Sequence, residues 1–111
     1  PQGNPEPGPE SELRYATRQD GIWSLETVDS DGDSGLFVSL QLDSFGTPHI
    51  SYYESTGEEL RYATKVAGAW VTEPIDPGAA TGPRSSLVVD SQNTVKVVYQ
   101  DADDLRIAIR Q

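Results

Sequence analysis

An 18-residue segment occurs twice in the chain at an offset of 47 residues, and this repeat constrains the fold more than any other feature. The segment ELRYATRQDGIWSLETVD begins at Glu12, and ELRYATKVAGAWVTEPID begins at Glu59. Alignment of residues 13–52 with 60–99 gives 16 identities in 40 positions without a gap. A third copy begins at Leu105 as LRIAIR, 45 residues after Leu60, so this repeat unit is two residues shorter than the first. Such a period is typical of architectures in which each unit packs on its neighbours.

Each repeat unit alternates along the chain with the period of a β-strand, and no segment shows a helical period. Turn-forming residues such as Asp20-Gly21 and Asp43-Ser44-Phe45-Gly46 separate the alternating segments. One full unit is therefore predicted to contain four short strands joined by hairpins, at 36–43, 48–54, 59–66 and 69–75. Two strands are predicted before this unit, at 13–18 and 21–28. Three are predicted after it, at 84–90, 94–100 and 105–110.

A repeated unit of four antiparallel strands predicts an all-β fold of β-propeller-like blades, about two and a quarter of them here. The blade repeats would occupy 12–58 and 59–104, with a third starting at 105–111. Apolar residues occur on both faces of the first two strands of each unit, so we expect these strands to be buried on both faces. The residues are Leu36, Phe37, Val38 and Leu40 in the full unit, and Val95, Val97, Val98 and Tyr99 in the next unit. A β-sandwich is the alternative, but it gives no reason for a constant offset.

Residues 1–11, PQGNPEPGPES, are rich in proline and predict a flexible arm or linker. An arm lying across a partner is the alternative interpretation. The chain contains no methionine and starts at Pro1, so we expect a processed, truncated or partly observed chain.

The pattern LRYAT…G-x-W…ETVDS…S-L-x-L-D-S-x-G-x-P-H-I-S-Y-Y resembles the repeats of bacterial, secreted β-propeller proteins. The resemblance covers residues 12–111. It implies a propeller fold and a secreted or periplasmic setting, and it implies no activity. The second unit departs from the pattern at 76–84, and it carries Lys96 in place of His49.

The balance of charge and the absence of cysteine exclude several classes of function. The formal net charge is −10, from 18 acidic and 8 basic residues, which argues against binding to nucleic acid or to anionic lipid. No apolar run approaches the roughly 20 residues of a membrane span, so we expect no direct membrane insertion. Without cysteine the chain can form no disulfide, thiolate metal site or thiol nucleophile.

Three carboxylates at alternate positions, Asp29, Asp31 and Asp33, are the candidate metal ligands. Around a glycine they resemble part of a calcium loop, although Ca²⁺ requires about six to eight oxygens. The alternative is a polar connector between two blades, because Asp, Ser and Gly favour turns. The next unit keeps Asp76 alone, so no cofactor is expected to be required.

The candidate ligand-binding residues are Trp23, Trp70, Arg61, His49 and Tyr53. The two tryptophans predict packing between blades, or else platforms for stacking a sugar. Arg61 belongs to a series with Arg14 and Arg106, in which each guanidinium pairs with an acidic neighbour or binds a carboxylated sugar. His49 and Tyr53 share a predicted face, but a general base also needs a nucleophile and an orienting partner. No catalytic residue is assigned.

These observations predict a non-enzymatic binding or scaffold module, a small accessory subunit of a larger extracytoplasmic assembly. A protein partner or other copies of the chain would complete the propeller. One alternative is an oligomeric lectin that binds carbohydrate between blades, and another is a fragment of a sialidase-like enzyme. We expect open apolar faces at both ends, so that the isolated chain is not a stable monomer. The residues expected on these faces are Val88, Val97 and Tyr99 at one end, and Tyr15 and Leu25 at the other.

Overall fold

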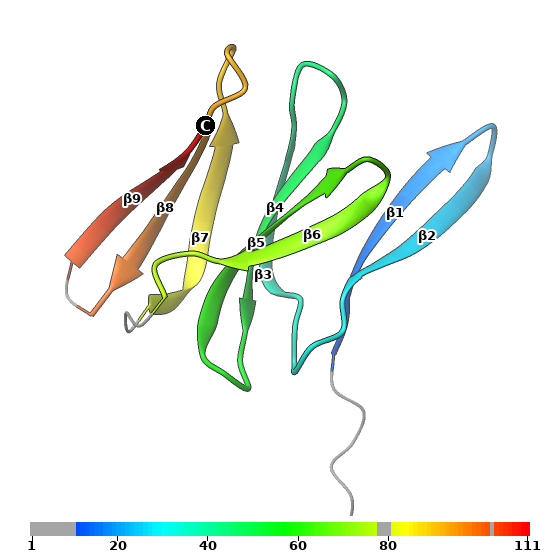
Figure 1. Cartoon of the computed structure of the whole chain (residues 1–111). Coiled ribbons are helices and arrows are strands. Elements are labelled where there is room, and N and C mark those ends of the chain that lie inside the picture. Colours follow the sequence, from blue (N-terminus) through cyan, green and yellow to red (C-terminus); the bar gives the residue numbers. More distant parts are fainter. Residues whose placement is uncertain (1–10, 78–80, 103) are drawn as a thin grey trace, which may run out of the picture.

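The computed structural model describes residues 11–77, 81–102 and 104–111, and its nine strands form three antiparallel sheets (Figure 1). The first sheet contains β1 (Leu13–Gln19) and β2 (Ile22–Asp29). The second, in the order β3-β4-β5-β6, contains β3 (Leu36–Leu42), β4 (Pro48–Glu54), β5 (Glu59–Val66) and β6 (Ala69–Pro74). The third contains β7 (Thr81–Val89), β8 (Val95–Asp101) and β9 (Asp104–Arg110).

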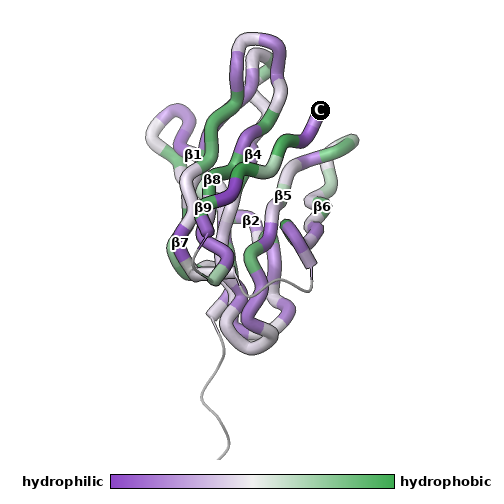
Figure 2. Tube along the Cα trace, turned by 90° about the vertical axis from the view of Figure 1, so that its left-hand side faces the viewer, coloured by the Kyte–Doolittle hydropathy of each residue, from purple (hydrophilic) through white to green (hydrophobic). Residues whose placement is uncertain are grey.

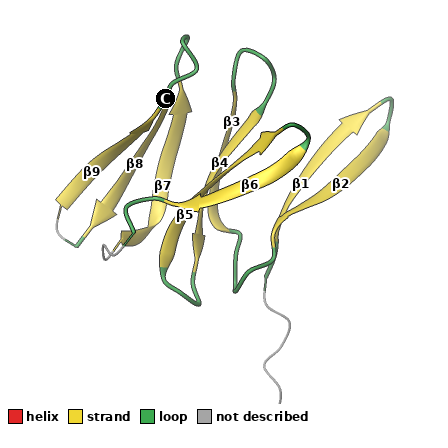
Figure 3. Cartoon of the chain, viewed as in Figure 1, coloured by secondary structure: helices red, strands yellow, loops and turns green. Residues whose placement is uncertain are grey.

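Every strand pairs with the strand next to it in the chain, and the described residues contain no helix (Figure 3). The predicted all-β fold is therefore confirmed. The largest difference from the predicted strand limits is at β7, which starts at Thr81 rather than at residue 84. Thr81 pairs with Asp101, and a register shift separates this pair from Ser85 opposite Tyr99. The irregular ladder lets β7 extend into residues 81–83, which belong to the stretch 76–84 where the second unit departs from the repeat pattern.

Two equivalent hairpins show how the sequence fixes the turns. Asp20 and Gly21 join β1 to β2 with φ values of 53° and 80°, and Ala67 and Gly68 join β5 to β6 with φ values of 52° and 83°. Positive φ at both central residues is the mark of a type I′ turn, whose twist matches that of the strands it joins. The glycine at the second position adopts this conformation without strain from a side chain.

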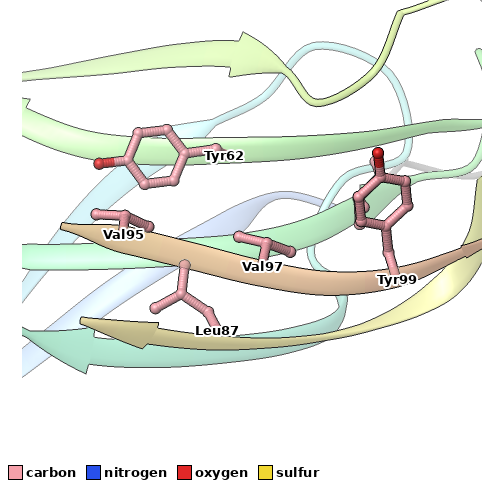
Figure 4. Packing of buried hydrophobic residues seen from close by; sticks show 6 residues of the cluster. Tyr62, Leu87, Val95, Val97 and Tyr99 are labelled. Atoms are coloured by element: carbon pink, nitrogen blue, oxygen red, sulfur yellow. The ribbon is translucent and has the colours of Figure 1, made fainter. Parts of the chain in front are cut away.

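The core lies between the sheets and consists of two clusters, each made by two neighbouring sheets. The first contains Leu13, Val28, Ile50, Tyr52 and Ala63. The second contains Leu60, Tyr62, Leu87, Val95, Val97 and Tyr99 (Figure 4). Residues of the two clusters correspond through the repeat, since Leu13 matches Leu60 and Tyr52 matches Tyr99 at the offset of 47. Each sheet therefore contacts the next by equivalent residues.

The prediction that the first two strands of a unit are buried on both faces is confirmed for β4 but wrong for β3. In β3, Phe37, Val38 and Leu40 are each exposed over nearly half of their surface. Leu40 lies opposite Ile50, on the side of the second sheet that faces the first. Within the described residues the first sheet has two strands, which contact β4, β5 and β6 but leave β3 in contact with solvent.

Candidate interaction site

A hydrogen-bonded cluster joins the first sheet to the second at the end of β2. The Tyr52 hydroxyl donates to Oδ2 of Asp29 at 2.6 Å, and the Arg61 guanidinium donates to the same oxygen at 2.8 Å. Arg61 also forms ion pairs with Glu59 at 2.7 Å and with Glu54 at 3.5 Å. Because Asp29 comes from one sheet and Tyr52 and Arg61 come from the next, the cluster fixes how these two sheets meet.

The electrostatics of this cluster favour a permanent ion pair. Burial raises the pKa of Asp29, but hydrogen bonds from Tyr52, the Asp31 amide and Arg61 outweigh it and lower that pKa overall. Burial and the neighbouring Asp29 raise the pKa of Tyr52. Burial lowers the pKa of Arg61, yet its pairs with Glu59 and Asp29 raise it overall. At neutral pH Asp29 is therefore charged and Tyr52 protonated, so neither is poised for proton transfer near pH 7.

The same cluster recurs between the second and third sheets. The Tyr99 hydroxyl and the Arg106 guanidinium both donate to Oδ2 of Asp76, each at 2.8 Å. Asp101 takes the place of Glu54 and pairs with Arg106 at 2.8 Å. Hydrogen bonds from Tyr99 and Arg106 lower the pKa of Asp76. We refer to the two trios as the Asp–Tyr–Arg joints.

The three repeated arginines differ in how much of the side chain is exposed. The Arg61 side chain is 12% exposed and the Arg106 side chain 45% exposed. Arg14, at the equivalent position of the first sheet, pairs with Glu12 at 3.0 Å and lies largely in solvent. All three thus have an acidic partner, as the pairing interpretation of this series expects.

The two tryptophans occupy equivalent repeat positions but different environments. The Trp70 ring packs edge-on against Tyr15 with 5.3 Å between centroids, and Lys65 lies 5.6 Å from the centroid of the indole. Its Nε1 donates to Oε1 of Glu26 at 3.1 Å, so Trp70 links β6 to β2. Trp23 is 61% exposed. Packing between sheets therefore accounts for Trp70, whereas Trp23 lies on an open face.

His49 is buried and uses both ring nitrogens in a structural network. Nε2 lies 2.9 Å from Oδ2 of Asp43 and Nδ1 lies 2.6 Å from the Tyr62 hydroxyl. Since a carboxylate accepts, Nε2 donates to Asp43, and in the neutral imidazole this leaves Nδ1 to accept from the Tyr62 hydroxyl. Lys96 takes the place of His49 in the third sheet and lies 3.6 Å from Asp90, the counterpart of Asp43. Tyr53 is thus not the partner of His49, although both lie in β4.

The three candidate metal ligands are bound to groups of the protein, and two of them, Asp29 and Asp31, share Arg61. Asp29 belongs to the first joint, and Asp31 extends into solvent and pairs with Arg61 at 3.2 Å. Asp33 accepts from the Ser11 amide at 2.9 Å and from the Ser55 hydroxyl at 3.1 Å. In the ranges that the structure describes, no three carboxylate or imidazole groups lie together as ligands of a metal would.

The loop of these aspartates is instead fixed on the buried carboxylate of Glu54. Its oxygens accept from the amides of Asp33, Thr56 and Gly57, at 3.1, 2.7 and 2.8 Å. Gly32 adopts φ 69°, and a Cβ there would overlap the Glu54 carboxylate. The glycine is therefore required both by the backbone conformation and by the close approach of this side chain.

Open apolar faces occur at both ends, but three of the expected residues are not on them. Val97, Tyr99 and Tyr15 face inward, into the contacts between sheets. The open face of the third sheet carries Val88, as expected, together with Val98, Leu105, Ile107 and Ile109. In Figure 2, in which this side of the molecule faces the viewer, parts of β8 and β9 are green, the colour of hydrophobic residues. The open face of the first sheet carries Leu25, as expected, together with Trp23.

Comparisons with known proteins add no further constraint on this site. No family model, curated protein or solved structure matches the chain. Among the described residues, no helix has the length and hydropathy needed to cross a membrane.

Proposed function

We propose that the protein is a non-enzymatic binding or scaffold module whose sheets act as blades of a β-propeller, completed by a protein partner or by other copies. One observation carries the proposal. Leu60 and Tyr62 are buried against the third sheet, whereas their counterparts Leu105 and Ile107 in the third sheet are exposed. A face that is covered inside the chain and bare at its end is complementary to one more unit of the same kind.

We further propose that the protein lies outside the cytoplasm as an accessory subunit of a larger assembly. This part of the proposal rests on the likeness of the LRYAT repeats to secreted propeller proteins. The repeated Asp–Tyr–Arg joints support a structural role, because their groups are committed to each other. Neither joint leaves a carboxylate poised for proton transfer at neutral pH.

The mass of the protein in solution tests the proposal. Light scattering coupled to size exclusion should give a mass above 12.1 kDa that rises with concentration, or a stable mass only together with a partner. A monomer that keeps one mass over a hundredfold range of concentration, and that melts cooperatively, would contradict the proposal.

A lectin is the second candidate, and the exposed indole of Trp23 is the observation that favours it. Exposed aromatic rings provide faces on which sugars stack. Binding on a glycan array that is abolished by Trp23→Ala, with the mass unchanged, would favour the lectin over the scaffold.

A further inference from the structure

The contact between the first and second sheets contains an aromatic slot that Trp70 fills. Three side chains define this slot in different ways: the Tyr15 ring packs on the indole, Glu26 accepts its N–H, and Lys65 lies over its face. Lys65 also forms an ion pair with Glu26 at 2.7 Å. The strand that carries the indole, β6, pairs with β5 at Lys65 opposite Trp70.

The contact between the second and third sheets contains side chains equivalent to those that surround Trp70, but no tryptophan. Tyr62, Glu73 and Arg110 stand at the repeat positions of Tyr15, Glu26 and Lys65. Arg110 pairs with Glu73 at 2.8 Å, as Lys65 pairs with Glu26.

All three side chains line a pocket of about 200 Å³, together with Ile75, Val97 and Ala108. An apolar cavity of about 150 Å³ accommodates benzene, so this pocket has room for a larger ring. The Arg110 guanidinium lies 5.3 Å from the centre of the Tyr62 ring, on the aromatic that would pack against the indole.

The backbone beside this pocket is also open. In the second sheet β5 pairs with β4 on one edge and with β6 on the other. Its counterpart β9 pairs with β8, and among the described residues no strand pairs with its other edge. An open edge presents a row of unpaired amides and carbonyls that an extended segment can complete.

We infer that this pocket and the edge of β9 together bind an extended polypeptide segment from a partner, which pairs antiparallel with β9 and places a tryptophan against Tyr62 and Glu73. The inference rests on the proposed function and specifies its interface. The indole N–H would donate to Glu73, as Trp70 donates to Glu26. Arg110 would lie over the ring, as Lys65 lies over Trp70.

A folded second copy does not supply this segment through β2. That strand carries Trp23 at the repeat position of Trp70, but it already pairs with β1 by the edge that β6 uses to pair with β5. The other edge of β2 could pair with β9 and keep the indole on the required face only if β2 ran parallel to β9. Turning a strand so that it presents its other edge while its side chains keep the same face reverses the chain direction.

A synthetic peptide of residues 67–76, AGAWVTEPID, is the probe, since it copies the strand that fills the first slot. Fluorescence anisotropy of the labelled peptide with the full 111-residue chain should show saturable binding. The W70A peptide should bind at least about tenfold more weakly, because the aromatic ring is the main apolar contact. Glu73→Ala in the chain should weaken binding about threefold or more, through the lost acceptor.

Glu26→Ala is the matched control, because Glu26 holds the same position in the filled slot. It should leave peptide binding unchanged. If the peptide instead displaced β6 and entered the first slot, binding would depend on Glu26 and not on Glu73. Absence of saturable binding, equal binding of the W70A peptide, or a loss caused by Glu26→Ala would each overturn the inference. If the chain nevertheless assembles with a partner or with itself, the proposed function stands and this interface alone is wrong.

Discussion

The two contacts between sheets are built from equivalent residues, yet their members differ in burial. Arg61 lies in β5, which has a paired strand on both edges. Arg106 lies in β9, which among the described residues has a paired strand on one edge. Trp70 packs against Tyr15 of the first sheet, whereas Trp23 faces solvent because no described sheet lies beyond the first. The place of a unit in the array therefore decides how buried a repeated residue is.

The largest effect is expected from removing the buried arginine. Arg61→Ala should lower the free energy of unfolding by about 3 kcal/mol, because it leaves the Asp29 and Glu54 carboxylates buried without their cation. Arg106→Ala is the matched variant and should cost much less, since solvent reaches both of its carboxylate partners. Urea unfolding followed by circular dichroism measures both. Equal losses would show that place in the array does not matter.

Loss of the packed indole should come next. Trp70→Ala should cost about 2–3 kcal/mol, at or below the lower limit of the roughly 3–5 kcal/mol of fully buried large aromatic residues, because Trp70 is partly buried. Trp23→Ala should change stability by less than about 0.5 kcal/mol, as expected for an exposed residue. Thermal unfolding of the two variants beside the parent tests the pair. A loss from Trp23→Ala as large as that from Trp70→Ala would mean that the first sheet is already covered in solution.

Acid should weaken the joints through their aspartates. The folded pKa of Asp29 is lowered, so its contribution is fully present above the unfolded pKa of about 3.9 and is lost as pH falls through the folded value. Unfolding measured from pH 7 to pH 3 should therefore show stability declining below about pH 5. Asp29→Asn should flatten this decline more than Asp76→Asn, because Asp76 is the more exposed. A decline with the same slope in both variants would contradict the comparison.

The smallest effect concerns the equivalent turns after β3 and β7. Gly46 adopts φ 80° in one, and Asn93 adopts φ 64° in the other. Asn93 also donates to the Ser44 hydroxyl at 2.8 Å, which joins the two turns. Asn93→Gly keeps the backbone conformation but removes this bond together with the one that Asn93 Oδ1 accepts from the Ser44 amide at 2.9 Å, so stability should fall by about 0.5 kcal/mol. Ser44→Ala removes the hydroxyl's bond alone and should cost less than Asn93→Gly, and a larger loss from Ser44→Ala would contradict this division.

Much of the fold could be predicted from the sequence because the repeat and the alternation both act locally. The period-2 pattern placed all nine strands, and turn residues such as Asp20-Gly21 marked the hairpins. The burial of β3 could not be predicted in this way. Leu40 has the composition of a core residue, but whether it is covered depends on which strands the neighbouring sheet holds.

The joints show the same limit at the level of a site. Asp29, Tyr52 and Arg61 each recur in the sequence as Asp76, Tyr99 and Arg106, yet nothing in the spacing alone brings three residues from three strands together. Their recurrence as a set was the available signal. Polar residues that repeat together are candidates for one network, because a buried carboxylate requires its partners in every unit.

Each Asp–Tyr–Arg joint also has a geometrical consequence. The joint is made of the same atoms at the end of β2 and near the end of β6, so it imposes a similar rotation from one sheet to the next. Units related by a constant rotation close into a ring when the steps sum to a full turn, and otherwise wind into an open helix. The rotation between neighbouring sheets that each joint imposes would therefore determine how many units such an assembly can hold.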